Sequence, residues 1–149
     1  MKITAYISDI LSGKSGTVWT IGPDATVYDA IARMAEHNIG AMPVVEQGQV
    51  IGLISERDYT RKIALQGKSS RETRVAEIMN RPVISVTPAT TIDACMQIVT
   101  RQRVRHLPVL EDGRLVGMIS IGDLVNWIIS AQDAALEQME SYIMGGYAA

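Results

Sequence analysis

The chain has 149 residues, of which 47% are hydrophobic and 20% are charged, and this is the composition of a folded globular protein. A net charge of −2 gives no broad electrostatic attraction to nucleic acid or to an acidic membrane. One cysteine, Cys95, cannot form an internal disulfide, and no apolar run approaches the roughly 18 residues that a membrane span needs. We therefore expect a cytoplasmic protein with neither a nucleic-acid nor a membrane partner.

The first half of the chain predicts two helices and three strands. A short strand at 17–21 precedes a helix at 25–38, whose apolar residues recur at helical spacing. Two further strands lie within 42–55, and Gln47-Gly48 between them is typical of a tight hairpin turn. A second helix follows from about residue 56. The predicted order is β-α-β-β-α.

The second half predicts the same order again. A strand at 83–86 precedes a helix at 90–102, and two strands within 107–120 flank the turn residues Asp112-Gly113. The next helix begins at about residue 121. Thr26 and Thr91 stand at the expected N-caps of the first helix in each half.

The two halves are an internal repeat with an offset of 65 residues. Residues 23–64 align without a gap to 88–129, and the alignment holds 11 identities in 42 positions: Pro23, Thr26, Pro43, Val44, Glu46, Gly48, Gly52, Ile54, Ser55, Asp58 and Ile63. Further upstream, ISDIL at 7–11 matches VAEIM at 75–79 with an offset of 68, so the first copy carries three extra residues in SGKSG.

These matches predict how the chain divides. We expect repeat 1 at 1–65, a polar linker at 66–74, repeat 2 at 75–130, and a C-terminal amphipathic helix and tail at 131–149. A unit of roughly 60 residues buries only a marginal core alone. The two repeats are therefore expected to pack sheet to sheet as one α/β (α+β) body with pseudo-two-fold symmetry.

The C-terminal segment carries an apolar stripe. Leu136, Met139 and Ile143 fall on one face of a helix, and Gly145-Gly146 are expected to end it. Such a helix covers either its own domain or a partner subunit, and the sequence leaves both open.

Each repeat places a Ser-x-x-Asp motif where an apolar strand meets a helix. Ser55 and Asp58, like Ser120 and Asp123, fit a capping box at the helix start. Capping leaves Gly52 and Gly117 unexplained, because glycine weakens a strand unless something approaches the backbone closely. A carboxylate beside bare backbone can also accept both hydroxyls of a ribose, while nearby N–H groups favour an anion. The two interpretations are compatible.

The duplicated β-α-β-β-α unit, with P-V-V, a glycine turn and G-x-I-S-x-x-D, resembles the cystathionine-β-synthase (CBS) domain, and two in tandem resemble a Bateman module. The resemblance covers 7–65 and 75–130. It implies central clefts that bind adenosine-containing ligands: AMP, ADP, ATP, NAD or S-adenosylmethionine. It also implies that Asp58 and Asp123 hold the ribose diol, with Ser55 and Ser120 beside the ribose and phosphate.

The resemblance further implies a cation cluster for the phosphate, since arginine suits phosphate through bidentate geometry. The basic candidates are Lys14, Arg57, Arg105 and His106, although Arg105 could simply be solvated near a helix end. Repeat 2 has Gly122 where repeat 1 has Arg57, so equal occupancy of two sites is not expected. The remaining residues expected to line the ligand sites are Thr20, Met42, Pro43, Ile54, Pro108 and Ile119.

The leading hypothesis is a non-enzymatic, adenine-nucleotide-binding regulatory or sensor module. It requires no cofactor, responds through the arrangement of its repeats or its partner contacts, and is expected to form a homodimer. The alternative is a ligand-free structural module that docks on a partner enzyme or transporter. Two histidines and one cysteine are too few for a zinc site, and the chain shows no nucleophile constellation, so we expect no catalysis.

Overall fold

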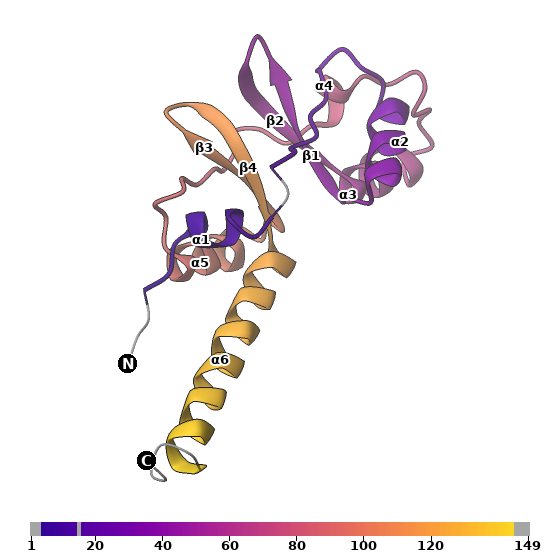
Figure 1. Ribbon diagram of the computed structural model, residues 1–149. Helices are drawn as coiled ribbons and strands as arrows, with labels where there is room; N and C mark the ends of the chain where they lie inside the picture. The colour runs from indigo at the N-terminus through magenta and orange to yellow at the C-terminus, as the bar shows by residue number, and fades with distance from the viewer. Residues whose placement is uncertain (1–3, 15, 145–149) are drawn as a thin grey trace. The chain divides into compact units, whose positions relative to one another are not determined.

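The computed structural model describes residues 4–14 and 16–144. Within these ranges the elements are, in chain order, α1 (Ile7–Leu11), α2 (Val27–His37), β1 (Ala41–Glu46), β2 (Gln49–Ser55), α3 (Glu56–Tyr59), the π-helical turn η1 (Thr60–Ala64), α4 (Val75–Ile78), α5 (Ile92–Gln102), β3 (His106–Glu111), β4 (Arg114–Ser120) and α6 (Ile121–Met144) (Figure 1). Strands β1 and β2 form one two-stranded sheet, and β3 and β4 form another. The predicted mixed α/β class is confirmed.

The chain divides into two compact units. Unit 1 is drawn from residues 1–15, 89–106 and 119–149, and unit 2 from 16–88 and 107–118. Each unit contains segments of both sequence repeats. The repeat bounds describe sequence similarity rather than spatial compactness, and they stay a prediction.

Both hairpins turn as the sequence predicts. Gln47 and Gly48 have φ values of 51° and 77°, and Asp112 and Gly113 have 52° and 79°. Two successive residues with positive φ are what a two-residue type I′ turn requires, and its twist matches that of the flanking strands. The β1–β2 ladder runs from Glu46 opposite Gln49 to Ala41 opposite Ser55.

The strands predicted at 17–21 and 83–86 are wrong as strands. Each contributes a single parallel bridge, Ile21 to Val44 and Val86 to Val109. The Ile21 N–H donates to the Pro43 carbonyl and the Val45 N–H donates to the Ile21 carbonyl, so one residue carries the whole pairing. A proline lies two residues beyond each bridge, and proline cannot donate to a ladder.

The first short helix of each repeat is hydrogen bonded to the other repeat. In unit 1, the Ile7 N–H of α1 donates to the Thr90 carbonyl just before α5, at 2.8 Å. In unit 2, the Val75 N–H of α4 donates to the Ala25 carbonyl just before α2, also at 2.8 Å. This exchange explains why the compact units cut across the sequence repeats.

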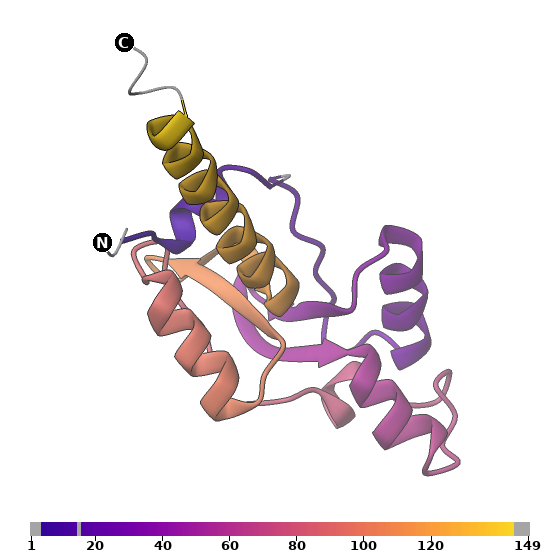
Figure 2. The ribbon, with the colours of Figure 1, turned by 90° about the horizontal axis from the view of Figure 1, so that it is seen from below.

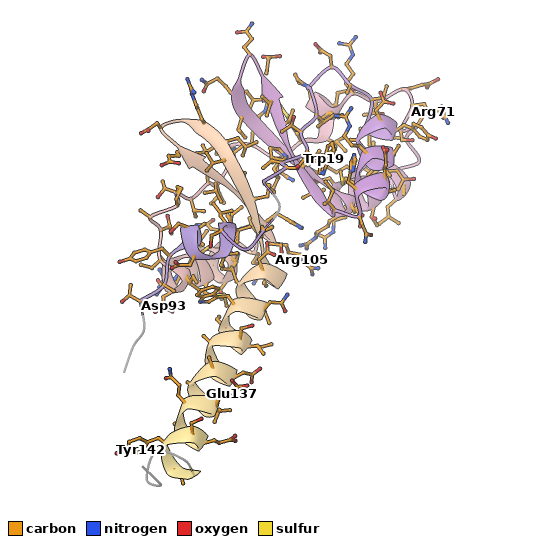
Figure 3. All side chains as sticks on the ribbon, in the orientation of Figure 1. Trp19, Arg71, Asp93, Arg105, Glu137 and Tyr142 are labelled. Carbon is orange, nitrogen blue, oxygen red and sulfur yellow. The ribbon has the colours of Figure 1, made fainter. Side chains whose placement is uncertain are left out.

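The predicted linker 66–74 is folded rather than a plain polar connection. The Val27 N–H donates to the Thr73 carbonyl and the Tyr28 N–H donates to the Ser70 carbonyl, which satisfies the first turn of α2. Arg71, which is labelled in Figure 3, lies over the Tyr28 ring with its guanidinium carbon 3.8 Å from the ring centroid. The linker therefore fixes the start of α2 and with it the apolar face that packs on β1 and β2.

Helix α6 is continuous from Ile121 to Met144, so the C-terminal helix extends the second helix of repeat 2. Its first turns pack in unit 1, where Leu124 is fully buried, and its later turns run on beyond α1 and α5 (Figure 2). Gly145-Gly146, expected to end this helix, lie outside the described residues. Within 4–14 and 16–144, none of the helices combines the length and the apolar character needed to cross a membrane.

Candidate functional site

The first Ser-x-x-Asp motif forms the predicted capping box at the junction of β2 and α3. The Asp58 N–H donates to Ser55 Oγ at 3.3 Å, and the Ser55 N–H donates to Asp58 Oδ2 at 2.9 Å. Ser55 Oγ also donates to Asp58 Oδ2 at 3.0 Å. These reciprocal bonds satisfy helix-start donors that would otherwise lack intrahelical partners.

Two further side chains reach the Asp58 carboxylate from outside the motif. Asn80 Nδ2 donates to Oδ1 at 2.9 Å and to Oδ2 at 2.8 Å, and Lys62 Nζ lies 3.3 Å from Oδ1. The Asp58 side chain is only 8% exposed. We call Ser55, Asp58, Lys62 and Asn80 the Asp58 cluster. Both carboxylate oxygens in it are engaged by the protein's own donors.

Backbone pairing holds Asn80 in this position. Its N–H donates to the Leu53 carbonyl at 2.8 Å, and the Leu53 N–H donates back to the Asn80 carbonyl at 3.1 Å. Lys62 is held by the Ile78 carbonyl, which accepts from Nζ at 2.7 Å. The Asp58 cluster is therefore built into the unit 2 framework rather than resting on flexible surface side chains.

The second motif has the same backbone geometry with a different partner. The Ser120 N–H donates to Asp123 Oδ2 at 2.8 Å, and the Asp123 N–H donates to Ser120 Oγ at 3.1 Å. Lys14 Nζ donates to the same Oδ2 at 2.7 Å. The Asp123 side chain is 23% exposed, and no described residue donates to its Oδ1. We call Lys14, Ser120 and Asp123 the Asp123 cluster.

The environment of Asp123 lowers its pKa below the ordinary value of 3.8. Burial raises the pKa, but the Lys14 ammonium and the hydrogen bonds from Ser120 outweigh it by stabilising the ionised form. Asp123 is therefore a carboxylate at neutral pH, with one oxygen held by Lys14 and Ser120.

Asp58 and Asp123 have different partners because those partners lie outside the repeated motif. With the repeat offset of 65, the position of Lys62 is Trp127 in the second copy. One residue beyond the matched segments 7–11 and 75–79, Asn80 corresponds to Ser12. Sequence reasoning missed Lys62 and Asn80 because it followed what the copies share. The signal that could have found Lys62 is a charged residue in one copy opposite an apolar ring in the other. Asn80 gives no such contrast, because Ser12 is polar as well.

The remaining predicted residues fall into two groups. Side chains of the first group are buried: Met42, Pro43, Ile54, Pro108 and Ile119. Contact between these residues and a ligand stays a prediction. The second group is exposed or half-buried: Thr20, Arg57, Arg105 and His106. Arg105 precedes β3 and lies beside the start of α6 (Figure 3), where its carbonyl accepts the Ile121 N–H at 2.9 Å.

Within unit 1 the structure joins Lys14 to Asp123, and Arg105 and His106 belong to the same unit. Arg57 belongs to unit 2 with Ser55 and Asp58. The convergence of all four basic residues on one phosphate stays a prediction.

Gly52 is explained by packing, which corrects the expectation of a ligand beside this strand. A Cβ at Gly52 would lie 2.5 Å from Met79 Sδ and 2.9 Å from Met79 Cγ. The group that approaches the bare backbone is therefore the Met79 side chain, which is buried in the unit 2 core. The glycine makes room for a core methionine and gives no support to a bound molecule.

The sequence repeat also matches a known family model. The model of the CBS domain matches twice, at residues 7–65 and 75–130. The chain belongs to the CBS domain family. Two domains in one chain make a CBS pair, which is a regulatory type of module.

Known CBS proteins cover most of this chain. The mitochondrial CBS domain-containing protein CBSX3 of Arabidopsis thaliana is 42% identical over 150 residues, which span 95% of this chain and 73% of CBSX3. A solved structure of a protein with CBS domains from Burkholderia ambifaria MC40-6 is 46% identical, with a TM-score of 0.83, and the alignment covers 86% of this chain and 96% of that one.

A more distant solved structure carries ligands. The CBS domain pair of protein MJ0100, in complex with 5′-methylthioadenosine and S-adenosyl-L-methionine, is 24% identical with a TM-score of 0.76. The alignment covers 87% of this chain and 99% of that one, and it shows a shared fold. Because CBSX3 is named as a mitochondrial protein, the cytoplasmic location stays a prediction for this chain.

Proposed function

We propose that this chain is a non-enzymatic regulatory module whose CBS pair binds an adenine nucleotide, namely AMP, ADP, ATP or NAD. Binding changes the arrangement of the repeats or their partner contacts. The ligand must bind one arrangement better than another, because equal affinity for both shifts no equilibrium. The module needs no cofactor of its own.

The observation that carries the proposal is the geometry of the Asp123 cluster. Asp123 presents an ionised carboxylate whose Oδ2 is held by Lys14 and Ser120, while Oδ1 accepts from no described residue. A carboxylate oxygen at a helix start is a strong acceptor for a ribose hydroxyl. Lys14, 36% exposed, supplies a cation that a phosphate could share.

The ligand class has a second support in the family. The CBS pair of MJ0100 binds two adenosyl compounds on the same fold. The methylthioadenosine and S-adenosylmethionine of that protein share the adenosine group with the proposed nucleotides. Fold likeness at 24% identity supports the class of ligand and leaves the choice within it to experiment.

Mass spectrometry of small molecules released from freshly purified protein tests the ligand class directly. We expect an adenine nucleotide. Calorimetric titration with AMP, ADP, ATP, NAD and S-adenosylmethionine should then give saturable binding for at least one of them. Absence of both a released nucleotide and any saturable binding would overturn the proposal.

A matched control variant separates ribose recognition from general charge. Asp93 is an exposed aspartate in the first turn of α5, outside the Ser-x-x-Asp motif (Figure 3). Asp93→Ala removes the same charge near a helix start and should leave nucleotide affinity unchanged. Asp123→Ala should weaken it.

The Asp58 cluster favours a second candidate function for its own copy. Both oxygens of Asp58 are engaged by Ser55, Asn80 and Lys62, which is the arrangement of a structural contact. In a structural module that docks on a partner enzyme or transporter, the aspartates of both copies would serve as structural contacts of this kind. Its signature is capture of the partner with no dependence on added nucleotide.

A further inference from the structure

Helix α6 carries a row of exposed side chains at alternating spacings of four and three residues. We call this row the α6 seam: Val125, Ile129, Gln132, Leu136, Met139 and Ile143. Its five apolar members are between 41% and 61% exposed. The alternation is that of the d and a positions of a coiled coil, with Ile129, Leu136 and Ile143 at a. The row spans residues 125–143, which is close to three heptads.

The α6 seam is distinct from the face that packs in unit 1. Leu124 is fully buried, and Trp127 and Ile128 are partly buried, while the neighbouring Val125 is 41% exposed. From Ile129 to Ile143 every side chain is exposed. Figure 1 shows this stretch running on beyond α1 and α5, and Figure 3 places Glu137 on it.

A helix with no packed face is marginal in water. Isolated helices shorter than about 12 to 15 residues are barely stable, because most helical stability in proteins comes from packing an amphipathic face. The exposed stretch of α6 has that length, and the CBS domain match ends at residue 130, before most of it. A partner on the α6 seam would supply the missing packing.

The charges of α6 indicate which partner fits. The helix contains four acidic residues and no lysine or arginine. With Ile129 at position a, the e positions are Asn126, Asp133 and Glu140, and the g positions are Ile128, Ala135 and Tyr142. In a parallel pair, each e position lies beside a g position of the partner, so both acids meet uncharged residues. In an antiparallel pair of copies, e positions face each other, and like charges oppose association.

Gln132, the polar residue of the α6 seam, also favours a parallel pair. Gln132 occupies a d position, and in a parallel pair each d position faces the same position of the other helix. The two Gln132 amides can then hydrogen bond to each other, since each carries donors and an acceptor. In an antiparallel pair, Gln132 would face an isoleucine or leucine at an a position, and an amide buried without a partner is costly. A single polar residue in such a seam fixes the register at a cost in stability.

We propose that the α6 seam pairs with that of a second copy of this chain as a parallel two-helix coiled coil. Five large apolar side chains from each copy then become buried, and Gln132 sets the register between them. The same surface on both copies makes the contact self-complementary. The proposal stands apart from nucleotide binding, since none of its residues lies in the Asp58 or Asp123 cluster.

Disulfide trapping of the full chain tests both the partner and its direction. In a parallel pair an a position faces its own copy, so Leu136→Cys should be converted mostly to a covalent dimer by oxidised glutathione at pH 8. Ala134→Cys, at the f position on the far side of α6, is the matched control and should give at least tenfold less. Native Cys95 does not interfere, because it is fully buried and burial raises its pKa to about 11.

A second measurement, which forms no covalent bond, excludes disulfides between monomers that collide at random. In sedimentation velocity, Leu136→Glu should weaken self-association at least tenfold relative to Ala134→Glu. Equal trapping of the two cysteine variants would overturn the proposal, as would equal association of the two glutamate variants. Failure of Leu136→Cys to form a covalent dimer, together with disulfide capture of a cysteine-bearing basic helical peptide, would also overturn it, in favour of a different protein as partner.

Discussion

The Asp58 and Asp123 clusters start from the same capping geometry and differ in what reaches the carboxylate. In both, the serine N–H donates to Oδ2 and the aspartate N–H donates to the serine Oγ. Asn80 and Lys62 then engage Asp58, whose side chain is 8% exposed. Asp123 is 23% exposed, and among the described residues Lys14 is the one side chain from outside the motif that engages it.

The repeated motif thus determines the capping geometry. Residues outside the motif determine whether the carboxylate is available to a ligand. A nucleotide that used Asp58 would have to displace an amide and an ammonium held by backbone contacts. A nucleotide that used Asp123 could keep Lys14 in place and bind Oδ1. We therefore expect two unequal sites within one CBS pair.

The largest loss of folding stability is expected at core residues that the two copies share. Ile54 and Ile119 are aligned and are 0% and 1% exposed. Ile54→Ala and Ile119→Ala should each lower the free energy of unfolding by about 2–5 kcal/mol, because each removes buried methyl groups and leaves a cavity. Urea denaturation followed by circular dichroism measures both. A cost below about 1 kcal/mol for one of them would mean that the copies differ in their cores as well.

The next largest loss of folding stability distinguishes the Asp58 cluster from the Asp123 cluster. Asn80→Ala should lower the free energy of unfolding by about 1–3 kcal/mol, since it removes two hydrogen bonds from a nearly buried carboxylate. The same change leaves Asp58 with Ser55 and Lys62 as its partners and should strengthen nucleotide binding at that copy. Ser12→Ala at the corresponding position is the control, and it should change stability by less than about 0.5 kcal/mol because Ser12 is exposed. Similar costs for the two variants would contradict the role of Asn80 in holding Asp58.

A smaller effect concerns the charge pair of the second copy. Lys14→Met should raise the pKa of Asp123, because it removes the ammonium that stabilises the ionised form. A carboxylate with a lowered pKa contributes stability above its unfolded pKa and loses it as the pH falls through the folded pKa. Acid unfolding of the variant should therefore lack this contribution. The carboxyl carbon resonance of Asp123, followed by pH titration with exposed Lys68→Met as the control, measures it; an unchanged pKa would exclude the Lys14 contact.

A pH-dependent effect is expected in the helices that precede the hairpins. Cys95 in α5 aligns with Ala30 in α2, and both are fully buried. Because burial raises the folded pKa of Cys95 from 9.0 to about 11, the unfolded chain loses this proton first as the pH rises. The free energy of unfolding should therefore fall between pH 9 and about 11 in the native protein. Cys95→Ala, measured by thermal unfolding over this range, should lack that part of the fall.

Much of the fold could be predicted from the sequence because local signals agreed with the repeat. Gln47-Gly48 and Asp112-Gly113 adopt the positive φ values that their turn type requires, and Thr26 caps α2 through a bond from the Asp29 N–H. The strand expected at 17–21 failed because apolar residues predict burial, whereas pairing depends on a neighbouring strand that continues alongside. Within that segment as the structure describes it, only Ile21 has one.

The candidate sites could be predicted in part. The positions of Ser55, Asp58, Ser120 and Asp123 follow from the motif itself. Asn80 reaches Asp58 from 22 residues away and Lys14 reaches Asp123 from 109 residues away, so these contacts depend on the tertiary fold. Nothing in the spacing of either residue predicts which carboxylate it will meet.

The decisive measurement is the affinity of AMP for Asp123→Ala, set against that for Asp58→Ala. Isothermal titration calorimetry should show a loss of about tenfold to a hundredfold for Asp123→Ala, the value of a hydrogen bond to a charged group. Asp58→Ala should change the affinity of the tighter site by less than about threefold, which is about half the free energy of a tenfold change. Equal losses in the two variants, or a larger loss for Asp58→Ala, would contradict unequal sites in the two copies of the motif.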